Sequence, residues 1–270
     1  MTTAATRLVA LLGHPVGHSA SPAIHSAAFS DAGIDAVYVA FDVAADDVPA
    51  AVAGLRALGA LGANVTVPHK RAVWEAADGH TPEAELVGVA NTLFWEGDAL
   101  VADNTDASGL ERVLTDDVGL AAGDPVVLFG AGGAARAAAV ALGRVGAVVE
   151  VTARRSGPAA EVADLVQRAG GHAVGSIDRP RVVVNATPLG LAGEALPDRF
   201  MDLGPGQVGL DLVYGPAATP FVAAARAGGA MAFDGLGMLV AQAALAFERW
   251  TGIPAPASVM AAAARDALSR

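Results

Sequence analysis

The fold of this 270-residue chain is decided by the stretch Val126-Val127-Leu128-Phe129-Gly130-Ala131-Gly132-Gly133-Ala134-Ala135. Four apolar residues typical of a β-strand run directly into a glycine-rich turn, and a helix-forming pattern follows. A second strand predicted at 148–152 completes the order expected of a dinucleotide-binding unit. Gly130 would permit the tight turn, and Gly132 would let the backbone approach a pyrophosphate. The alternative is a glycine-rich turn in an α/β fold that binds no nucleotide.

The tip of that second strand indicates which dinucleotide is bound. NAD sites usually place an acidic residue there for the ribose 2′-hydroxyl, whereas the 2′-phosphate of NADP calls for arginine. Glu150 falls inside the strand, and the tip reads Ala153-Arg154-Arg155-Ser156. Because guanidinium groups suit phosphate oxygens, this tip favours NADP. The alternative is a pair of solvated loop arginines.

On both sides of this unit, apolar β-type runs alternate with alanine-rich helical patterns, which favours an α/β fold with parallel sheets. Towards the N-terminus we predict strands at 7–12, 37–41 and 63–67, helices at 22–33 and 46–58, a short helix from His69, and a hairpin turning at Glu96-Gly97-Asp98. Towards the C-terminus we predict a helix from 132, strands at 181–185 and 208–212, and helices at 158–169, 219–228, 236–250 and 257–269. The polar segment 115–125 is interpreted as the boundary between two α/β domains.

The composition excludes several classes of protein. The 17 Lys and Arg residues face 28 Asp and Glu residues, a net charge of −11, whereas a nucleic-acid binder usually presents a basic face. The absence of Cys excludes disulfides, iron–sulfur clusters and thiolate zinc sites, and no metal is expected. No apolar run reaches the roughly 18 residues of a membrane span. These observations favour a soluble, cytoplasmic protein without nucleic-acid or membrane partners.

Scarce residue types gather at the predicted strand ends. Lys70 is the one lysine beside sixteen arginines, and asparagine occurs only at positions 64, 91, 104 and 185. An ammonium group can release a proton and a guanidinium effectively cannot, so a lone lysine indicates either special chemistry or chance survival. The segments 64–70, 88–92, 103–109 and 185–190 read as polar loop edges, where α/β sheets place their ligands.

Eight linked motifs occur in order along nearly the whole chain. They are Gly13–Pro22 with Ile24-His25, Asn64–Lys70, Gly88–Thr92, Asn104–Asp106 with Gly109, Gly130–Arg136, Asn185–Gly190, Asp211–Tyr214 with Pro216, Thr219 and Pro220, and Asp234–Met238 with Gln242. Together they resemble the motifs of the shikimate dehydrogenases, and the set is far more specific than any one of its members.

The resemblance implies NADP-linked interconversion of shikimate and 3-dehydroshikimate, a step toward the aromatic amino acids. It also implies a substrate domain of residues 1–105 and 237–270, completed by the C-terminal helices, and a Rossmann-type NADP domain of residues 106–236. The active site is expected in the cleft between the two domains. The expected partner is the small-molecule substrate, and the protein is expected to be a monomer or a homodimer.

The same resemblance assigns roles to individual residues. Lys70 and Asp106 would form the catalytic pair. Substrate binding would fall to Ser19, Ser21 and Tyr214 at the carboxylate and to Thr66, Asn91 and Gln242 at the ring hydroxyls. Cofactor binding would fall to Gly130, Ala131, Gly132, Gly133, Ala134, Arg154, Arg155, Asn185, Ala186, Thr187, Gly235 and Met238, with Met238 near the nicotinamide.

Two departures from the family pattern leave points open. The family commonly has Asn-Arg-Thr where this chain has Ala153-Arg154-Arg155, so the division of 2′-phosphate binding between the arginines is open. The family often has Gly before Asn104, so the local turn at Ala102-Asp103 is open as well. Lys70 could transfer a proton or only stabilise the forming negative charge. Asp106 could hold Lys70, bind a neighbouring hydroxyl or share the proton.

The histidines of these motifs are expected to support loops and not to bind a metal. We expect His18 to orient the Ser19 loop by hydrogen bonding and His69 to point away from the substrate. Two alternative functions are carried forward. One is a related dehydrogenase that accepts quinate or uses NAD. The other is a non-catalytic dinucleotide-binding sensor, which would be expected to have lost Lys70 or Asp106.

Overall fold

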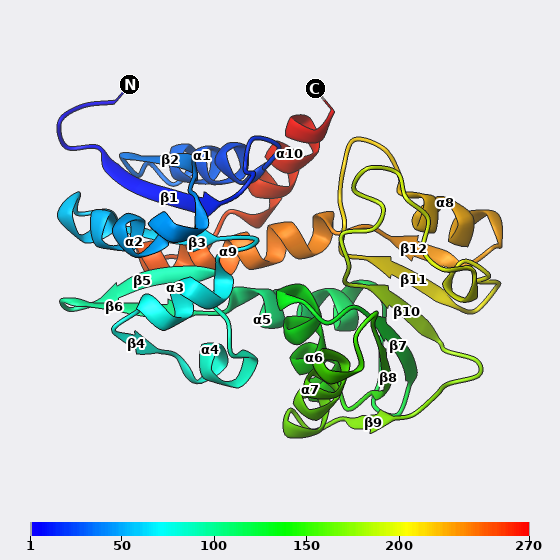
Figure 1. Cartoon of the computed structure of the whole chain (residues 1–270). Coiled ribbons are helices and arrows are strands. Elements are labelled where there is room, and N and C mark those ends of the chain that lie inside the picture. Colours follow the sequence, from blue (N-terminus) through cyan, green and yellow to red (C-terminus); the bar gives the residue numbers. More distant parts are fainter. Residues whose placement is uncertain (1, 270) are drawn as a thin grey trace. The chain divides into compact units, whose positions relative to one another are not determined.

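The computed structural model describes residues 2–269, which form two compact α/β units (Figure 1). The first unit contains the described residues up to Thr105 and from Val240 onward, and the second contains Asp106–Leu239. Each unit is built on a six-stranded sheet, which confirms the α/β class. The boundary predicted at 115–125 is wrong, because Leu110 and Leu114 pack into the hydrophobic core of the second unit. The polar segment 115–125, which begins in a π-helix of residues Val113–Asp117, therefore lies within that unit.

The first unit has a mixed sheet, and its order is β2-β1-β3-β5-β6-β4. Its strands are β1 (Arg7–Gly13), β2 (Ala36–Asp42), β3 (Gly62–Val65), β4 (Gly79–His80), β5 (Thr92–Glu96) and β6 (Ala99–Asp103). Its helices are α1 (Ser21–Asp31), α2 (Val48–Ala57), α3 (Lys70–Ala76), α4 (Pro82–Val87), α10 (Ala257–Leu268) and all but the first four residues of α9 (Leu236–Thr251).

Strand direction in this sheet is mixed, and the hairpin predicted at Glu96-Gly97-Asp98 is confirmed. Strand β1 pairs in parallel with β2 and β3, but β5 runs antiparallel to both β3 and β6. The reason is the short turn between β5 and β6, in which Gly97 adopts a left-handed φ of +61°, since a connection this short joins only antiparallel strands. As a result, the carboxyl ends of β1, β3 and β6 and the amino end of β5 share one edge of the sheet.

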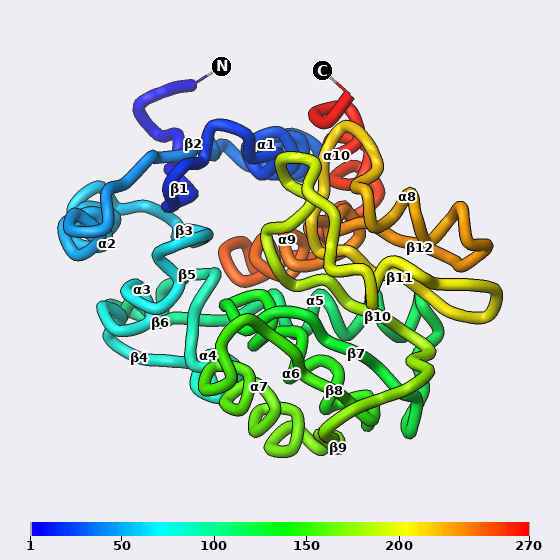
Figure 2. Tube along the Cα trace, turned by 45° about the vertical axis from the view of Figure 1, so that its right-hand side comes forward, coloured from blue at the N-terminus to red at the C-terminus, as the bar shows by residue number. Residues whose placement is uncertain are grey.

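Helices from both ends of the chain pack in this first unit. Helix α10 lies against α1, as the red and blue ends of the trace show in Figure 2. All three tryptophans of the chain also belong to this unit. Their indole N–H groups donate to backbone carbonyls: Trp74 to Ala84, Trp95 to Ala60 and Trp250 to Leu93. The tryptophans thus tie the helices and strands of this unit together.

The second unit has a fully parallel sheet of order β12-β11-β10-β7-β8-β9. Its strands are β7 (Pro125–Phe129), β8 (Val148–Thr152), β9 (His172–Val174), β10 (Val182–Asn185), β11 (Val208–Asp211) and β12 (Met231–Phe233). Its helices are α6 (Gly133–Val145), α7 (Ser156–Arg168), α8 (Pro220–Ala227) and α5 (Thr105–Arg112) beyond its first residue. This is the strand order of a Rossmann fold. The order in which successive strands are added to the sheet reverses between β7 and β10, and all strands remain parallel.

The buried face of α6 explains how this helix packs so close to the sheet. Residues Ala137–Ala141 are completely buried, and their small side chains allow a near approach of helix and strands. Gly143 allows a close approach of the neighbouring helix α7, since a Cβ there would lie 2.6 Å from the carbonyl oxygen of Val166 in that helix. The alanine-rich composition is therefore a packing requirement in this part of the chain.

Several elements differ from the predictions. The segment 103–109 was interpreted as a loop, yet α5 begins at Thr105. The helix α4 and the short strands β4, β9 and β12 were not predicted. Serine and glycine in 105–112 lower helix propensity, and strands of two or three residues show no readable alternation. Tertiary packing decides these elements.

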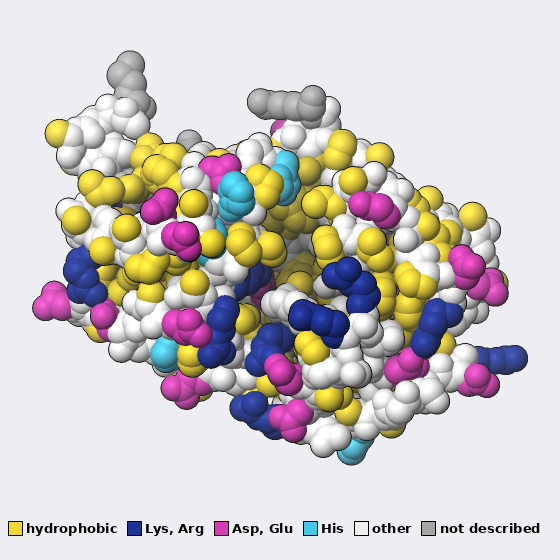
Figure 3. Space-filling view, viewed as in Figure 1, with side chains coloured by type: hydrophobic (Ala, Val, Ile, Leu, Met, Phe, Trp, Pro, Cys, Tyr) yellow, Lys and Arg dark blue, Asp and Glu magenta, His cyan; other side chains and the backbone are white. Residues whose placement is uncertain are grey.

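Within the described residues, no helix combines the length and apolar character needed to cross a bilayer. On the face shown in Figure 3, acidic and basic side chains are intermixed.

Candidate active site

Five of the residues predicted to bind substrate or react with it in the first unit lie in loops or at the first residue of a helix, at one edge of its sheet, and Gln242 lies in α9. That edge is the one where β1, β3 and β6 end and β5 begins. The residues placed there are Ser19 and Ser21 after β1, Thr66 and Lys70 after β3, and Asn91 before β5. Asp106 follows β6 by three residues and is the first residue of the second unit.

Lys70 is the first residue of α3, and its backbone is tied to the neighbouring loop. The N–H of Ala90 donates to the Lys70 carbonyl oxygen at 3.0 Å. The preceding His69 is buried, and its ring Nε2 lies 2.7 Å from the Val43 carbonyl oxygen. Because a carbonyl only accepts, Nε2 carries the proton in this bond. His69 therefore joins the loop after β2 to the residue beside Lys70.

The loop that carries Ser19 is not oriented as expected. Among the described residues, His18 is exposed and makes no hydrogen bond to Ser19. The Ser19 hydroxyl instead accepts the backbone N–H of Ser21 at 3.2 Å. The prediction for His18 is wrong, because a local serine turn at the start of α1 already holds this loop.

Buried amide and hydroxyl groups form a continuous hydrogen-bonded set along the same edge, which we call the amide network. Asn91 is its centre: Oδ1 accepts the Thr105 N–H at 2.8 Å, and Nδ2 donates to Thr105 Oγ1 at 2.9 Å. The same Nδ2 lies 3.3 Å from Gln242 Oε1, which brings the C-terminal helix α9 into the set. The members of the network are Tyr38, Asn64, Asn91, Thr92, Thr105 and Gln242.

The other half of the network reaches the edge strand β2. Asn64 Nδ2 donates to Thr92 Oγ1 at 3.1 Å, and the Tyr38 hydroxyl donates to Asn64 Oδ1 at 2.8 Å. Sequence reasoning quoted Asn64 without giving it a role and missed Tyr38. The only available signal was that tyrosine occurs just twice in the chain. Asn104 also proves structural, since its Nδ2 donates to the Val89 carbonyl oxygen at 3.0 Å.

The second unit contains a cavity of about 490 Å³ at the carboxyl edge of its sheet, which we call the nucleotide cavity. It lies beside the topological switch point between β7 and β10. Its lining residues are Phe129, Gly130, Ala131, Gly132, Ala153, Arg154, Arg155, Pro158, Ala186, Thr187, Pro188, Leu189 and Pro197. It therefore brings together the glycine turn, the arginine tip and the Asn185–Gly190 motif.

Two glycines of the turn have different reasons to be glycine. Gly130 has a φ of +136°, and a Cβ there would lie 2.7 Å from the Ala186 carbonyl oxygen. Gly132 has an ordinary extended backbone, and a Cβ there would meet nothing within 4 Å. The empty space above Gly132, at the N-terminus of α6, is where an anion could contact free backbone amides.

The two arginines at the tip of β8 are available to a ligand. Both are exposed and line the cavity, and within residues 2–269 neither guanidinium group has an ionic or hydrogen-bonding partner. Glu150 is engaged elsewhere: it is 4% exposed, accepts the Ile177 N–H at 2.8 Å and pairs with Arg199. The cavity thus offers two guanidinium groups and no carboxylate.

Asn185 supports the cavity from below and does not line it. Its Oδ1 accepts the Thr187 N–H at 3.0 Å, and its Nδ2 donates to Asp211 Oδ1 at 2.8 Å. Burial raises the pKa of the Asp211 carboxyl, and hydrogen bonds from Thr219, Val213 and Asn185 oppose that rise. Sequence reasoning placed Asp211 and Thr219 in a motif without recognising this support.

Three further predicted residues lie in the second unit but outside the nucleotide cavity. Met238 is packed in the hydrophobic core of the unit. Gly235 is buried, and a Cβ there would lie 2.3 Å from the Leu212 carbonyl oxygen. Tyr214 follows β11, and burial raises the pKa of its phenol, which keeps the hydroxyl protonated.

Gly133 and Ala134 form the first turn of α6, directly after the glycine turn. They do not line the cavity, but they belong to the helix N-terminus that faces it.

Comparison with known proteins identifies the family. The family model described as the shikimate dehydrogenase substrate binding domain matches residues 11–93, and that of the shikimate 5'-dehydrogenase C-terminal domain matches residues 235–265. The shikimate dehydrogenase (NADP(+)) of Moorella thermoacetica is 44% identical, over 98% of this chain and 95% of that protein.

Two solved structures illustrate the range of the similarity. Shikimate 5-dehydrogenase of Thermus thermophilus, in complex with NADP(H) and shikimate, matches with a TM-score of 0.85 and 36% identity, over 97% of this chain and all of that chain. The ligand-free 5-ketofructose reductase of a Gluconobacter strain matches with a TM-score of 0.86 and 32% identity, over 98% of this chain and 99% of that chain.

A Rossmann unit with a phosphate-type cavity, joined to an α/β unit with a polar sheet edge, defines the class as a dinucleotide-dependent oxidoreductase. Full-length similarity to the Moorella enzyme narrows this class to one family of such oxidoreductases. The chain belongs to the shikimate dehydrogenase family, which confirms the resemblance found in the motifs.

Proposed function

We propose that this chain is an NADP-dependent shikimate dehydrogenase, which reversibly reduces 3-dehydroshikimate to shikimate in aromatic amino acid biosynthesis. The observation that carries the proposal is the position of Lys70. The single lysine of the chain begins α3 at the sheet edge that also holds the amide network. A lysine retained by chance would not be expected at this particular position.

The residues of the second unit fit NADP. A pyrophosphate has room above Gly132, where a Cβ would meet no atom within 4 Å, and the N-terminus of α6 favours negative charge there. Arg154 and Arg155 would hold the 2′-phosphate. Asn185 would keep Thr187 in place at the wall of the cavity through its two hydrogen bonds to that residue.

We assign the substrate to residues 1–105 and 237–270 and the cofactor to residues 106–236. Ser19, Ser21 and Tyr214 would bind the carboxylate, and Thr66, Asn91 and Gln242 would bind ring hydroxyls. Gly130–Ala134, the two arginines and Asn185–Thr187 would hold the cofactor. Gly235 and Met238 would contact the cofactor from outside the nucleotide cavity.

The reaction needs a hydride at the carbonyl carbon and a proton at the developing alkoxide. Bound NADPH supplies the hydride. Lys70 would place its ammonium group at the carbonyl oxygen and stabilise the negative charge that forms there. Single donors of this kind contribute about 2.7–4 kcal/mol in other enzymes. Asp106 would orient the ammonium group, and the amide network would keep Asn91 and Gln242 in position for the ring hydroxyls.

A spectrophotometric assay at 340 nm tests the proposal. Shikimate and quinate are each offered with NADP and with NAD, and we expect turnover of shikimate with NADP to be fastest. Faster turnover of quinate, or of either substrate with NAD, would favour the broader dehydrogenase. If none of the four mixtures shows an absorbance change, the non-catalytic dinucleotide-binding sensor is the remaining function.

A second substrate class deserves its own mixture in this assay, because a 5-ketofructose reductase shares the fold at 32% identity. Preference for 5-ketofructose with NADPH would show that the fold alone does not set the substrate. We expect no such preference, since Lys70, Asn91 and Gln242 match the shikimate motifs residue by residue.

We also propose that the enzyme acts in the cytoplasm as a monomer or a homodimer. The dissolved, charged substrate and cofactor support this location. Cell fractionation with an antibody tests the location, and size-exclusion chromatography with light scattering measures the mass of the assembly.

A further inference from the structure

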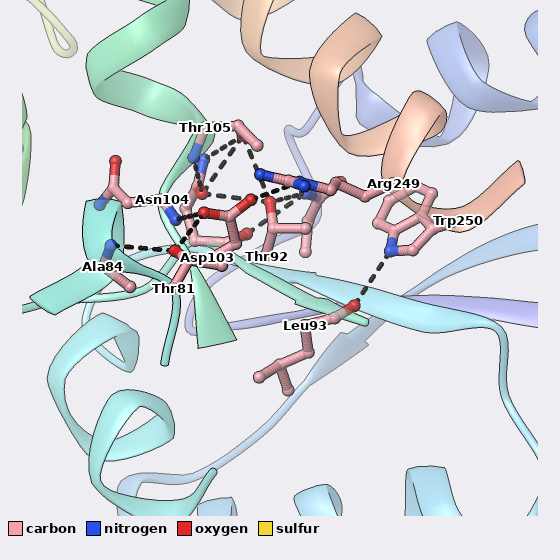
Figure 4. Close-up of polar contacts among 11 residues, drawn as sticks. Thr81, Ala84, Thr92, Leu93, Asp103, Asn104, Thr105, Arg249 and Trp250 are labelled. Atoms are coloured by element: carbon pink, nitrogen blue, oxygen red, sulfur yellow. Dashed lines mark hydrogen bonds and ion pairs between the residues drawn. The ribbon is translucent and has the colours of Figure 1, made fainter. Parts of the chain in front are cut away.

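The carboxylate of Asp103, the last residue of β6, lies beside Thr92 of the amide network (Figure 4). It is 2% exposed. Oδ1 accepts the Thr81 hydroxyl at 2.6 Å and the Asn104 N–H at 2.8 Å, and Oδ2 accepts Nε–H of Arg249 at 2.8 Å. A buried carboxylate persists only when it is paired and hydrogen-bonded, and here its ionic partner comes from the helix α9.

Arg249 is held in a fixed orientation on the sheet. Its guanidinium carbon lies 5.3 Å from the centre of the Phe94 ring, and its Nε–H is directed at Asp103. A planar guanidinium can stack on the ring and donate sideways at the same time, which the ammonium of a lysine cannot do. The contact therefore restrains both the position and the rotation of this part of α9.

The same helix face carries Gln242 to the amide network. Gln242 and Arg249 are seven residues apart, so at about 3.6 residues per turn they lie on one face of the helix. Gln242 reaches Asn91, and the Asn91 N–H donates to the Asp103 carbonyl oxygen at 3.1 Å. Two points of α9 thus contact the paired ends of β5 and β6. Gln242 does so through a long hydrogen bond between side-chain amides, and Arg249 through an ion pair.

We propose that Asp103 and Arg249 are positioning residues for the substrate: their ion pair, beside the Trp250 hydrogen bond to Leu93, sets the register of α9 so that Gln242 reaches Asn91. The Trp250 indole holds α9 against β5, and the ion pair adds a second fixed point at the end of β6. A shift of α9 by a fraction of a turn would separate Gln242 from Asn91 and misplace the Gln242 amide, while Asn91 stays bonded to Thr105. The role rests on the proposed function, because the ligand of these amides is taken to be shikimate.

The chain offers a control at the opposite end of the same strand, which differs in that the side chain of its acidic residue, Asp78, is 46% exposed whereas that of Asp103 is 3% exposed. Arg56 pairs with Asp78, which accepts the N–H of Leu100 near the start of β6. The Arg56 guanidinium lies 5.1 Å from the Trp95 ring centre, and the side chains of Arg56 and Arg249 are 50% and 49% exposed. Both arginines stack on a ring of β5, but only Arg249 contacts the residue beside the amide network.

The test compares Arg249→Gln with Arg56→Gln in steady-state kinetics. We expect Arg249→Gln to raise the shikimate KM about tenfold and to leave the NADP KM unchanged. A tenfold change corresponds to about 1.4 kcal/mol of binding free energy. Arg249→Lys should recover part of the loss, and Arg56→Gln should leave both KM values at the wild-type level. Equal shikimate KM values for Arg249→Gln and Arg56→Gln would overturn the proposal.

A double-mutant cycle shows whether Arg249 acts through Gln242. In a Gln242→Ala background, Arg249→Gln should change the shikimate KM less than twofold, because the residue it positions is gone. Independent, multiplicative effects of the two substitutions would overturn the proposal. If Arg249→Gln alone does not fold, Asp103→Asn/Arg249→Gln replaces it. This pair leaves no buried charge without a partner, and the same KM increase is expected.

Hydrogen–deuterium exchange provides a readout that does not depend on turnover. Exchange of the amides in 240–251 should be faster in Arg249→Gln than in wild type and unchanged in Arg56→Gln. If wild type does not turn over shikimate, the proposed function fails, and exchange still decides the role of the ion pair. Equal exchange of this segment in the two variants would overturn that role.

Discussion

The amide network of the first unit and the nucleotide cavity of the second are built on opposite principles. In the amide network, Asn91 and Gln242 are buried and already hydrogen-bonded to protein groups. In the nucleotide cavity, Arg154 and Arg155 are exposed and, within residues 2–269, their guanidinium groups have no protein partner.

The difference teaches how each region recognises its ligand. A preassembled set of buried amides has little freedom, so it selects by geometry, and its failure should appear as a loss of fit. Free guanidinium groups beside an open helix N-terminus select by charge. Substitutions should therefore act through position in the first unit and through charge in the second.

The largest expected effect tests whether Lys70 adds chemistry to the preassembled edge. Lys70→Arg should lower kcat about 100- to 1000-fold, the loss of one transition-state donor, with the shikimate KM nearly unchanged. Arginine keeps the charge but places its donors on a planar fork and does not release a proton. Arg71→Lys, one residue further along α3, serves as the control in the 340 nm assay. A Lys70→Arg enzyme within tenfold of wild type would remove Lys70 from the reaction.

The next effect concerns the charge of the nucleotide cavity. Replacing both Arg154 and Arg155 by alanine should raise the NADP KM about 10- to 100-fold, because hydrogen bonds to charged groups contribute about 1.5–3 kcal/mol. The NAD KM should not change, since NAD lacks the 2′-phosphate. The two single variants divide the contribution between the arginines, and Arg168→Ala, at the far end of the following helix α7, is the control. Equal losses for NADP and NAD would show that neither arginine reads the phosphate.

A pair of glycine substitutions separates folding from ligand binding in the same cavity. Gly130→Ala forces a left-handed φ and a contact 2.7 Å from the Ala186 oxygen, so it should destabilise the protein by at least about 1–2 kcal/mol. Gly132→Ala places its methyl group in open space, so Tm should stay unchanged while the NADP KM rises. Thermal unfolding and kinetics on both variants test this. A Gly132→Ala variant with wild-type NADP affinity would contradict the placement of the pyrophosphate.

The smallest expected effect is on the pH dependence of stability, and it comes from His25, which packs against Tyr38 of the amide network. This ring is completely buried, stacks on Tyr38 at 4.5 Å, and has no hydrogen bond of normal geometry. Burial lowers the pKa of His25 to about 3, and the neighbouring Asn64 opposes only part of that effect. Because the folded pKa is depressed, the contribution to stability is full above pH 6.5 and is lost as the pH falls toward 3.

At pH 5.5 the loss should be about 1.4 kcal/mol relative to neutral pH. His25→Phe, which cannot be protonated, should flatten this part of the stability profile. Urea unfolding of both proteins between pH 4 and pH 8 measures it. Parallel profiles would show that His25 is not the titrating group.

The sequence predicted best where a local pattern and a topological rule coincide. The run from Val126 to Ala135 predicted β7, the turn and α6, because glycine conformation and strand periodicity are local properties. Lys70 and Asn91 were likewise found from their scarcity at strand ends. By contrast, the role of Arg249 could not be predicted, since its partner Asp103 lies 146 residues away in the sequence.

The errors have physical causes of the same kind. Segment 103–109 was interpreted as a loop because of its polar residues, but Asp103 accepts the Asn104 N–H and Asn91 accepts the Thr105 N–H where α5 begins. One of these two acceptors, Asn91, lies 14 residues away in the sequence, so the segment alone does not show how the helix N-terminus is satisfied. The predicted bond from His18 was wrong, since the Ser19 hydroxyl accepts the Ser21 N–H and the His18 side chain is exposed.

The three tryptophans offer a means of observing the two units separately. All of them lie in the first unit, so the intrinsic tryptophan emission of the protein reports on that unit alone. Far-ultraviolet circular dichroism reports on the helices of both. If the two signals change at different temperatures, the units melt independently, and the optical difference assigns each transition without any label.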